Sequence, residues 1–538
     1  MNQVGHIFTK DVRRHWPEIA ATLGLTGLFG WTMSHQTASS LNAGGPEYLG
    51  GVLALAMLLA LLLPVSWWVT ITRLVQGESL VGDTQWWITK PYEWGRLLAA
   101  KILFLATFVL APLFLAQLWL LWAAGFNPLG HWGGLTLDVA LTAAVIVVPL
   151  MALSTVTKSL SRVTVTILGV LLAMIAGAAL IGWLHIGRMT TSAADEVVYP
   201  AMLLLALAAI VLQYARRQVW ASRGMLAAAV VLMGVGAACS TNAGLIAMTY
   251  PQNGATAAAA VAYDAQLPAW TNPTAMHEVR LMLPLHAAGL TAGSGVILDG
   301  VRATVTTADG RRWESAWQPA NGTRIVGAEG RGYVPVQMKA GFYEAARQGP
   351  VTIRLRLAAV DIRAGNTKRL TMGAGDFVVP GVGICTPQND NGGRGYSTMR
   401  CWSAVRPPQL TQVTGQWSQM PCGQNVAGAP EQTAVGDAWF GQLHPAVTSG
   451  LNPVVKMPVN LSNPLNPPLL AVGNVGAAAN ASARRYLCPG APLSFTPYRE
   501  VAKTQYETTI ADFQLPEVKQ EKVQPFNSPG LHVETRTE

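Results

Sequence analysis

The sequence predicts an α-helical transmembrane bundle of about seven spans, followed by an extracytoplasmic, mainly β domain with a sandwich-like fold. Three observations lead to this fold class. Only 12% of the 538 residues are charged, and the apolar residues concentrate before about residue 250. They form runs close to the roughly 20 residues that an α-helix needs to cross a bilayer. Beyond these runs apolar and polar residues alternate with a period of two, as in strands. This part of the chain also holds four of the five cysteines.

The organisation along the chain has four parts. Residues 1–17 form an amphipathic helix at the membrane surface, and residues 18–248 form the transmembrane domain. Residues 249–518 form the β-rich domain, and the polar segment 519–538 is a tail. We find no internal repeat of the solenoid type.

The first segment carries an apolar stripe with a spacing of four residues, as in an amphipathic helix that lies along a membrane. The stripe consists of Val4, Phe8, Val12 and Trp16. The charged side chains fall on other faces and are Lys10, Asp11, Arg13 and Arg14. We expect Pro17 to turn the chain into the bilayer.

The predicted spans are seven apolar runs. They lie near residues 18–36, 50–72, 102–124, 135–157, 163–184, 197–215 and 225–248. The first run is the weakest, because it is short and contains three glycines. A signal peptide is the alternative for this run, but Asp11, Glu18 and the lack of a small-residue cleavage site argue against it.

The basic residues predict the orientation of the spans, because cytoplasmic loops retain an excess of Lys and Arg. With a cytoplasmic N-terminus, the inner segments hold twelve Lys and Arg residues, and the outer loops hold only Arg188. An odd number of spans then places the segment after about Tyr250 outside the cytoplasm. The protein is therefore expected to be a multi-pass protein of the cell membrane.

The cysteines agree with an exported domain. Cys385, Cys401, Cys422 and Cys488 follow the last span, and an even number outside the cytoplasm predicts two disulfides among three possible pairings. Free thiols and a zinc site are the alternatives, and the absence of a CxxC pair or a compact histidine cluster argues against zinc. Cys239 lies within the last span, where a small packing residue is expected.

Strands are predicted by alternation. In residues 351–362 the apolar positions occupy one face and Thr352, Arg354 and Arg356 the other. Residues 301–317 resemble a hairpin whose turn is Asp309-Gly310. The stretch 403–486 is rich in Pro, Gly, Asn and Ala, which predicts a loop-rich insertion.

The sequence lacks the usual catalytic motifs. It contains no GxxxxGK[ST] phosphate loop, no HExxH and no GxSxG, so the chain is not expected to be an enzyme or to hydrolyse a nucleotide itself. No cofactor or metal is expected, although His35, His131 and His185 all fall at outer span ends. Asp138 is placed in the first turn of a span, where the helix dipole favours an acid. Basic residues do not cluster, which argues against nucleic acid as a partner.

The connection between the second and third predicted spans, residues 74–101, has an unusual composition. Its sequence is "LVQGESLVGDTQWWITKPYEWGRLLAAK". An aromatic belt at the membrane interface would explain the tryptophans alone. The segment also presents a defined order of residues, namely Glu78, Gly82, Thr84, Trp86, Trp87, Ile88, Pro91, Trp94, Leu97, Leu98 and Lys101.

This order resembles that of the membrane subunits of ATP-binding-cassette exporters of the second type (ABC-2). Those subunits carry, between their second and third spans, a glutamate, Gly and Thr, apolar residues, a proline, more apolar residues and a lysine that opens the next helix. The resemblance covers about residues 1–217. Two features depart from the family, because Asp83 interrupts the Gly-Thr pair, and a seventh span and a large exterior domain follow the usual six.

The resemblance implies a permease that couples to a separate ABC ATPase subunit, which binds the ATP, and that works as a homodimer or with a similar permease. The loop 74–101 would place Trp86, Trp87 and Trp94 in a cleft of the ATPase, with Glu78 and Lys101 fixing the helix ends. The alternative is a membrane-anchored receptor or assembly protein whose exterior domain binds a ligand or partner. A membrane enzyme with an exterior active site has only scattered His, Asp and Ser residues in its support.

Overall fold

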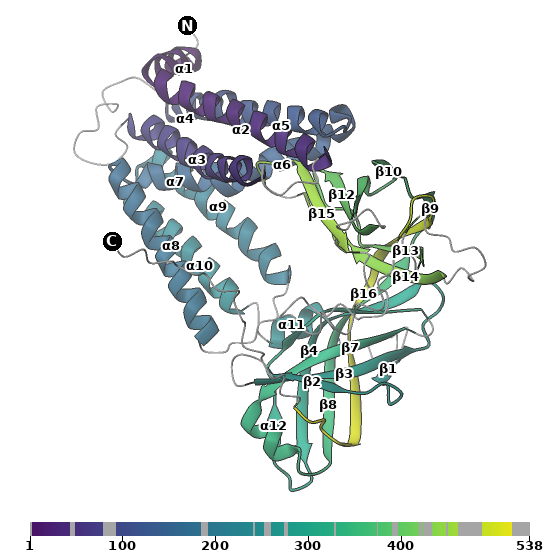
Figure 1. The fold of residues 1–538 in the computed structure, drawn as a ribbon. Coiled ribbons are helices and arrows are strands. Elements are labelled where there is room, and N and C mark those ends of the chain that lie inside the picture. Colours follow the sequence, from purple (N-terminus) through teal and green to yellow (C-terminus); the bar gives the residue numbers. More distant parts are fainter. Residues whose placement is uncertain are drawn as a thin grey trace, which may run out of the picture. The chain divides into compact units, whose positions relative to one another are not determined.

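A computed structural model gives the fold of this chain (Figure 1). The structure describes residues 3–42, 49–78, 93–183, 192–239, 243–251, 260–273, 278–327, 330–373, 375–389, 396–418, 422, 433–447, 450–460 and 487–518. The predicted tail 519–538 lies outside these residues. Among the described residues, helices make up most of the first part of the chain and strands most of the part that follows, as the sequence predicts.

The helices follow one another from the N-terminus to about residue 249 (Figure 1). Those of the first half are α1 (Gln3–Arg14), α2 (Trp16–Asn42), α3 (Leu49–Gln76), α4 (Trp94–Leu105), α5 (Ala111–Ala123) and α6 (Trp132–Thr142). The later ones are α7 (Val148–Val156), α8 (Leu160–Trp183), α9 (Ser192–Arg216), α10 (Val219–Cys239) and α11 (Ala243–Thr249). Three short segments connect them, η2 (Ala106–Leu110), η3 (Pro128–His131) and η4 (Ala143–Val147).

Five helical stretches of the described residues are long and apolar enough to cross a membrane. They are Ala54–Gln76, Trp94–Ala123, Pro128–Val156, Leu160–Gly177 and Val198–Arg216. The predicted number of about seven is therefore not confirmed. The other two predicted runs do form helices, α2 and α10, and the apolar part of α10 is the shorter stretch Val219–Gly234.

Two of the spans are interrupted by a wide π-helical turn. The segments η2 and η4 are π-helices, and a proline follows each of them, Pro112 in α5 and Pro149 in α7. Proline lacks the N–H that would bond to the carbonyl four residues earlier, and its ring crowds that carbonyl. A π-turn before the proline relieves the conflict and lets the helix continue.

The helices pack around a common apolar core. α2 packs against α3 and α5, and α9 packs against α10 and α7. Large buried side chains of this core include Trp67, Ile71, Phe104 and Leu113. The same core contains Ile7 of α1, so the predicted surface helix also packs against protein.

The contacts of the chain divide it into two compact units. The first consists of Met1–Ile186, Thr191–Leu245 and Arg363–Glu500, and the second of Gly187–Thr190, Ile246–Ile362 and Val501–Glu538. The mainly β region that follows the helices is thus shared between two units. The chain passes from one unit to the other within the strands β8 (Val351–Ala364) and β16 (Pro492–Phe513).

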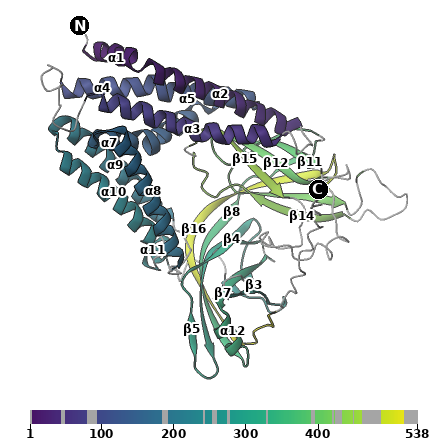
Figure 2. The ribbon, with the colours of Figure 1, turned by 60° about the vertical axis from the view of Figure 1, so that its left-hand side comes forward.

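The first unit contains two groups of antiparallel strands around one apolar core. One group has the order β10-β11-β12-β15, with β10 (Phe377–Val379), β11 (Gly383–Asn389), β12 (Tyr396–Ala404) and β15 (Val454–Asn460). Figure 2 labels β11, β12 and β15 of this group. In the other, β13 (Thr411–Ser418) pairs with β14 (Thr433–Phe440) and with the start of β16, and β9 (Lys368–Thr371) also pairs with β16.

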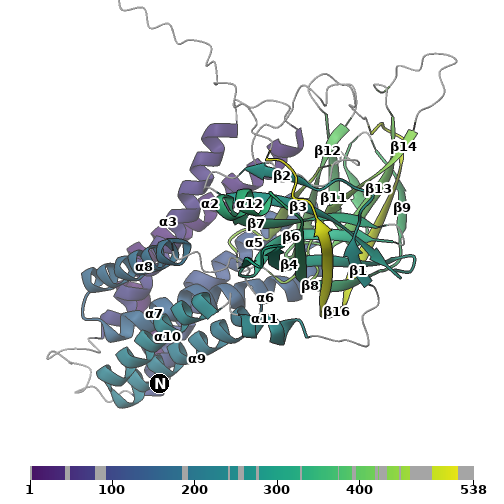
Figure 3. The same cartoon turned by 90° about the horizontal axis from the view of Figure 1, so that it is seen from below.

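The second unit also contains two groups of strands around a core of its own. β3 (Glu278–Ala288) pairs with β1 (Ala260–Tyr263), β2 (Trp270–Pro273) and β7 (Arg331–Lys339). The other group has the order β16-β8-β4-β5, with β4 (Ser294–Thr307), β5 (Arg312–Glu314) and β6 (Gln318–Val326) paired to β4. The short helix α12 (Ala340–Ala346) contacts β3 and β7 (Figure 3).

The strands that were predicted from alternating apolar and polar residues are confirmed. In β8 the apolar positions from Val351 to Leu357 are buried, and Thr352 and Arg354 are exposed. β4 and β5 form the predicted hairpin, and Gly310 has the positive φ of 85° that this turn requires. The described part of the stretch 403–486 is less irregular than predicted, because β13, β14 and β15 lie in it and pair with other strands.

Candidate functional site

Most of the predicted coupling loop lies outside the described residues, which end at Glu78 and resume at Glu93. The residues concerned are Gly82, Asp83, Thr84, Trp86, Trp87, Ile88 and Pro91. The structure does describe both ends of the loop. Glu78 follows the last turn of α3, and Trp94 and Lys101 belong to α4.

Lys101 is the centre of a group of four charges at the base of this loop, three of which are buried. Only 1% of its surface is exposed, and its ammonium donates a hydrogen bond to the Asp11 carboxylate at 2.8 Å. The same ammonium lies 3.7 Å from the Glu78 carboxylate, which also accepts a hydrogen bond from Lys10 at 3.0 Å. We call these four residues the loop-base charge cluster: Lys10, Asp11, Glu78 and Lys101.

The cluster joins three elements through alternating charges. α1 supplies Lys10 and Asp11, the end of α3 supplies Glu78, and α4 supplies Lys101. Asp11 and Glu78 are 2% and 6% exposed, so neither carboxylate is solvated as it would be at a surface. Buried charges are costly unless they are paired and hydrogen-bonded, and here each acid contacts a lysine. The cluster therefore fixes both ends of the loop to α1.

Aromatic and aliphatic contacts position α1 on α4. Ile7 is buried in the helical core, and the Phe8 ring stacks on Phe108 with 5.9 Å between ring centroids. Phe8 also meets the edge of Phe104. Asp11 lies one helical turn after Ile7 and therefore shares its buried face, which brings it to Lys101.

Asp11 lies on the packed face of α1, and not on the charged faces where the sequence led us to expect it. Asp11 is only 2% exposed, whereas Trp16 of the predicted stripe is the first residue of α2 and is 65% exposed. The physical reason is that α1 packs against a helix that offers a buried cation, so an acid belongs to the packed face. The sequence does contain a signal for this position. Asp11 is the one acid in a basic segment, and it lies four residues after Ile7 and therefore on the same helix face.

Further polar contacts hold the corner between α1 and α2 against the end of α3. Arg14 donates to the carbonyl oxygen of Gly77 at 3.4 Å, and Arg73 pairs with Glu18. His15 lies in this corner, and burial lowers the pKa of its imidazole below the ordinary value of 6.5. The imidazole is therefore favoured in its neutral form beside these charges.

Trp94 is presented differently from Lys101. It is the first residue of α4 and is 45% exposed, next to the surface ion pair between Glu93 and Arg96 at 2.9 Å. A half-exposed indole at a helix end can contact a protein partner or the membrane interface. The described end of the loop thus combines a buried ionic anchor with an exposed aromatic side chain.

Asp138 does not occupy the first turn of a span, where the sequence led us to expect it. α6 begins at Trp132, so Asp138 is the seventh residue of the helix and lies beyond the reach of its N-terminal dipole. It is 1% exposed and accepts hydrogen bonds from the side chain of Gln117 and from the backbone N–H of Gly450. Asp138 therefore links two spans to the β region of the same unit.

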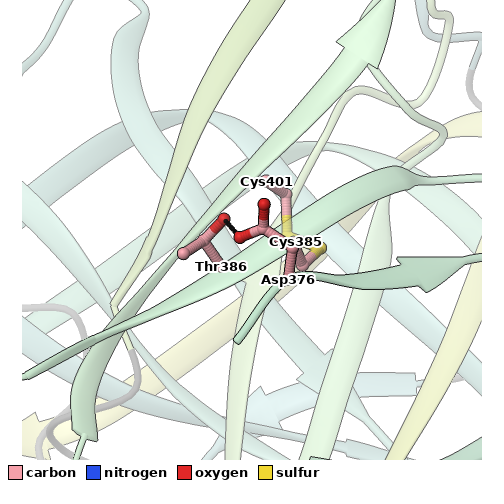
Figure 4. The surroundings of a disulfide bond; sticks show 4 residues. All are labelled: Asp376, Cys385, Thr386 and Cys401. Carbon is pink, nitrogen blue, oxygen red and sulfur yellow. Dashed lines mark hydrogen bonds between the residues drawn. A yellow bond between two sulfur atoms is a disulfide. The ribbon is translucent and has the colours of Figure 1, made fainter. Parts of the chain in front are cut away.

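The four predicted cysteines form two disulfides, Cys385–Cys401 and Cys422–Cys488. Cys385 and Cys401 are directly opposite each other on β11 and β12, and both are buried. Beside this bond the Thr386 hydroxyl donates to the Asp376 carboxylate (Figure 4). The pairing follows from strand register, which the sequence alone does not reveal.

The described residues contain no group of three or more His, Cys, Asp and Glu side chains that could hold a metal ion. His131 ends η3, and the His35 ring contacts the carbonyl oxygen of Trp31 at 2.9 Å. His185 lies outside the described residues. Cys239 is the last residue of α10.

No family model matches this chain, and no curated protein matches it either. A functional interpretation therefore depends on the residues themselves. Two features are available for it: the order of residues in the loop 74–101, and the loop-base charge cluster that anchors the loop.

Proposed function

We propose that this chain is the membrane permease subunit of an ABC exporter. ATP is bound and hydrolysed by a separate ATPase subunit, and the loop 74–101 transmits the movement of that subunit to the spans. In this proposal the N-terminus and the loop are cytoplasmic, and the region after about residue 250 is outside the cytoplasm. The excess of Lys and Arg in the corresponding segments supports this orientation.

The observation that carries the proposal is the contact of Lys101 with both Asp11 and Glu78. A loop that transmits force needs a stiff base, because a flexible base would absorb the displacement of the partner. Here the end of α3, the second turn of α4 and the helix α1 are joined by buried charges. A displacement of the loop would therefore move α1, α3 and α4 together.

The tryptophans of the loop supply the other half of the proposal. Trp86, Trp87 and Trp94 are apolar anchors of the kind that dominate protein interfaces. The sequence has no phosphate loop, so a separate chain must supply the ATP-binding site. ABC ATPases act in pairs, and a second copy of this permease or a similar chain would complete the assembly.

The proposal is tested by co-purification and ATPase assays in lipid nanodiscs. The full-length protein should recover an ABC ATPase under conditions that keep such complexes intact. Changing Trp86, Trp87 and Trp94 to Ala should abolish recovery and any permease-dependent ATPase activity. Trp220→Ala is the control, because this indole is 83% exposed at the start of α10 and lies outside the loop. Unchanged coupling in the triple variant would refute the proposal.

A second candidate function is a membrane-anchored receptor or assembly protein whose exterior β region binds a ligand or partner. The observation that favours it is the apolar contact of Leu121 and Leu135, at the ends of α5 and α6, with Trp402 and Val405 of the β region. Such a contact would carry a change in the β region to the spans. In this case the three Trp→Ala changes would leave function intact, whereas changes at Trp402 would impair it.

A further inference from the structure

Asp138 is a buried acid whose hydrogen bonds come only from uncharged donors. Its two oxygens accept from different donors, Oδ1 from the Gly450 N–H at 3.1 Å and Oδ2 from the Gln117 amide. Both oxygens therefore act as acceptors, the pattern of an ionised carboxylate. None of the ion pairs among the described residues includes Asp138.

Two neutral oxygens near Asp138 also lack partners. Gln117 Oε1 and Thr142 Oγ1 are buried and make no hydrogen bond within the described part of the chain. The Gln117 amide nitrogen is already shared between Asp138 and the carbonyl oxygen of Gly450, at 2.9 Å from the latter. Thr142 follows Asp138 by one helical turn and so lies on the same face of α6.

We infer that Asp138, Gln117 and Thr142 form a binding site for one small monovalent cation such as Na⁺. Carboxylate, amide and hydroxyl oxygens are hard ligands that suit such ions. One carboxylate balances one positive charge, whereas Ca²⁺ sites collect several oxygens that include more than one acid, and Mg²⁺ retains waters. A bound cation satisfies the two unpartnered oxygens and offsets the cost of the buried charge.

The site lies at an irregular part of the span and at a junction of segments. The π-helical segment η4 begins directly after Thr142 and interrupts the regular hydrogen bonds of the span. The site also joins three segments, since Gln117 belongs to α5, Asp138 and Thr142 to α6, and Gly450 to the β region. A bound cation would strengthen this junction whether or not the protein is a permease.

The test measures the Tm of the full-length protein in nanodiscs. NaCl replaces choline chloride stepwise, so that the ionic strength stays constant. A ligand that binds only the folded state raises Tm in a saturable manner. We expect Na⁺ to raise Tm and choline to leave it unchanged. Equal Tm values in both salts would overturn the inference and would favour ordered water at these oxygens.

Three variants locate the effect. Asp138→Asn removes the charge and Thr142→Val removes one ligand with little change of shape, so both should lose the Na⁺-dependent shift. Thr136→Val is the matched control on the same helix, because the Thr136 hydroxyl is exposed and bonds to the Trp132 carbonyl oxygen. It should retain the shift of the original protein. A shift that persists in Thr142→Val would overturn the assigned ligands, even where Asp138→Asn fails to fold.

Discussion

The Lys101 ammonium lies 2.8 Å from the carboxylate of Asp11, a residue 90 positions earlier in the sequence, and both side chains are almost completely buried. This pair connects the first helix of the chain to the helix that follows the loop 74–101. The Glu78 carboxylate extends the connection to the other end of the loop. The ends of a segment that is long in sequence are thus held at one point in space.

Loss of the Lys101 charge should destabilise the protein strongly. Lys101→Met keeps the volume of the aliphatic stem but leaves Asp11 buried without its cation. Removing one partner of a buried ion pair costs about 3–5 kcal/mol. We expect a corresponding fall in the free energy of unfolding, measured by denaturation in detergent.

Arg96→Met is the matched control for this experiment. Arg96 also lies on α4, but its ion pair with Glu93 is exposed. Exposed pairs contribute about 0–1 kcal/mol, so this variant should stay close to the original protein. The double change Lys101→Met with Asp11→Leu should recover part of the lost stability, because it leaves no buried charge on either side. Equal effects of the two single changes would contradict the buried cluster.

Periodicity in the sequence predicts the helix α1 but not every contact of its packed face. The spacing of Val4, Phe8 and Val12 correctly predicts a helix with a packed face, because side chains four residues apart share a face of any helix. The side on which Asp11 lies depends on the partner, and Lys101 is brought there only by the tertiary fold. Local spacing therefore predicts the element but not its electrostatic contact.

The same limit applies to the spans and to the disulfides. Pro112 and Pro149 lie inside predicted spans, so a kink can be expected at each from the sequence. The π-turns themselves depend on which hydrogen bonds each helix forms around its proline. Four cysteines predict two bridges. Their pairing depends on the register of β11 with β12, which places Cys385 opposite Cys401. Register is a tertiary property, because it depends on which strands meet.

A side chain at Gly134 should separate α6 from the β region of the first unit. A Cβ atom on Gly134 would lie 3.0 Å from the Cγ1 atom of Val405, a distance tighter than ordinary van der Waals contact. Gly134→Val should therefore cost about 1–3 kcal/mol through overpacking. It should also increase hydrogen exchange of residues 402–405. The adjacent change Gly133→Val is the control, because its Cβ meets no atom within 4 Å. Equal destabilisation by both changes would show that helix propensity, and not this contact, is responsible.

The two disulfides should differ in their access to reductant. Cys385 and Cys401 are buried in the core of the first unit, whereas Cys422 and Cys488 are partly exposed. Thiolate attack requires access to a sulfur atom, so mild reduction should open Cys422–Cys488 first. Alkylation followed by mass spectrometry of the native protein measures the order. Replacing either pair by serine should lower the free energy of unfolding by about 2–5 kcal/mol. Earlier labelling of Cys385 and Cys401 would contradict the burial of this bond.

Asp361 should give the second unit a stability that falls as pH rises through the acidic range. Burial raises the pKa of its carboxyl above the ordinary value of 3.8, although the hydrogen bond from Tyr506 opposes this rise. Between the ordinary value and the raised one, the folded state binds more protons than the unfolded state, so the free energy of unfolding decreases with pH. Asp361→Asn removes this titration and should flatten the slope, whereas Tyr506→Phe removes the opposing hydrogen bond and should steepen it. Hydrogen exchange of β8 and β16, measured across the acidic pH range, gives the slope of the free energy of unfolding for each protein. The buried amide of Asp361→Asn adds a cost that does not change with pH, so the slopes can still be compared. Identical slopes in all three proteins would show that Asp361 does not control the pH dependence.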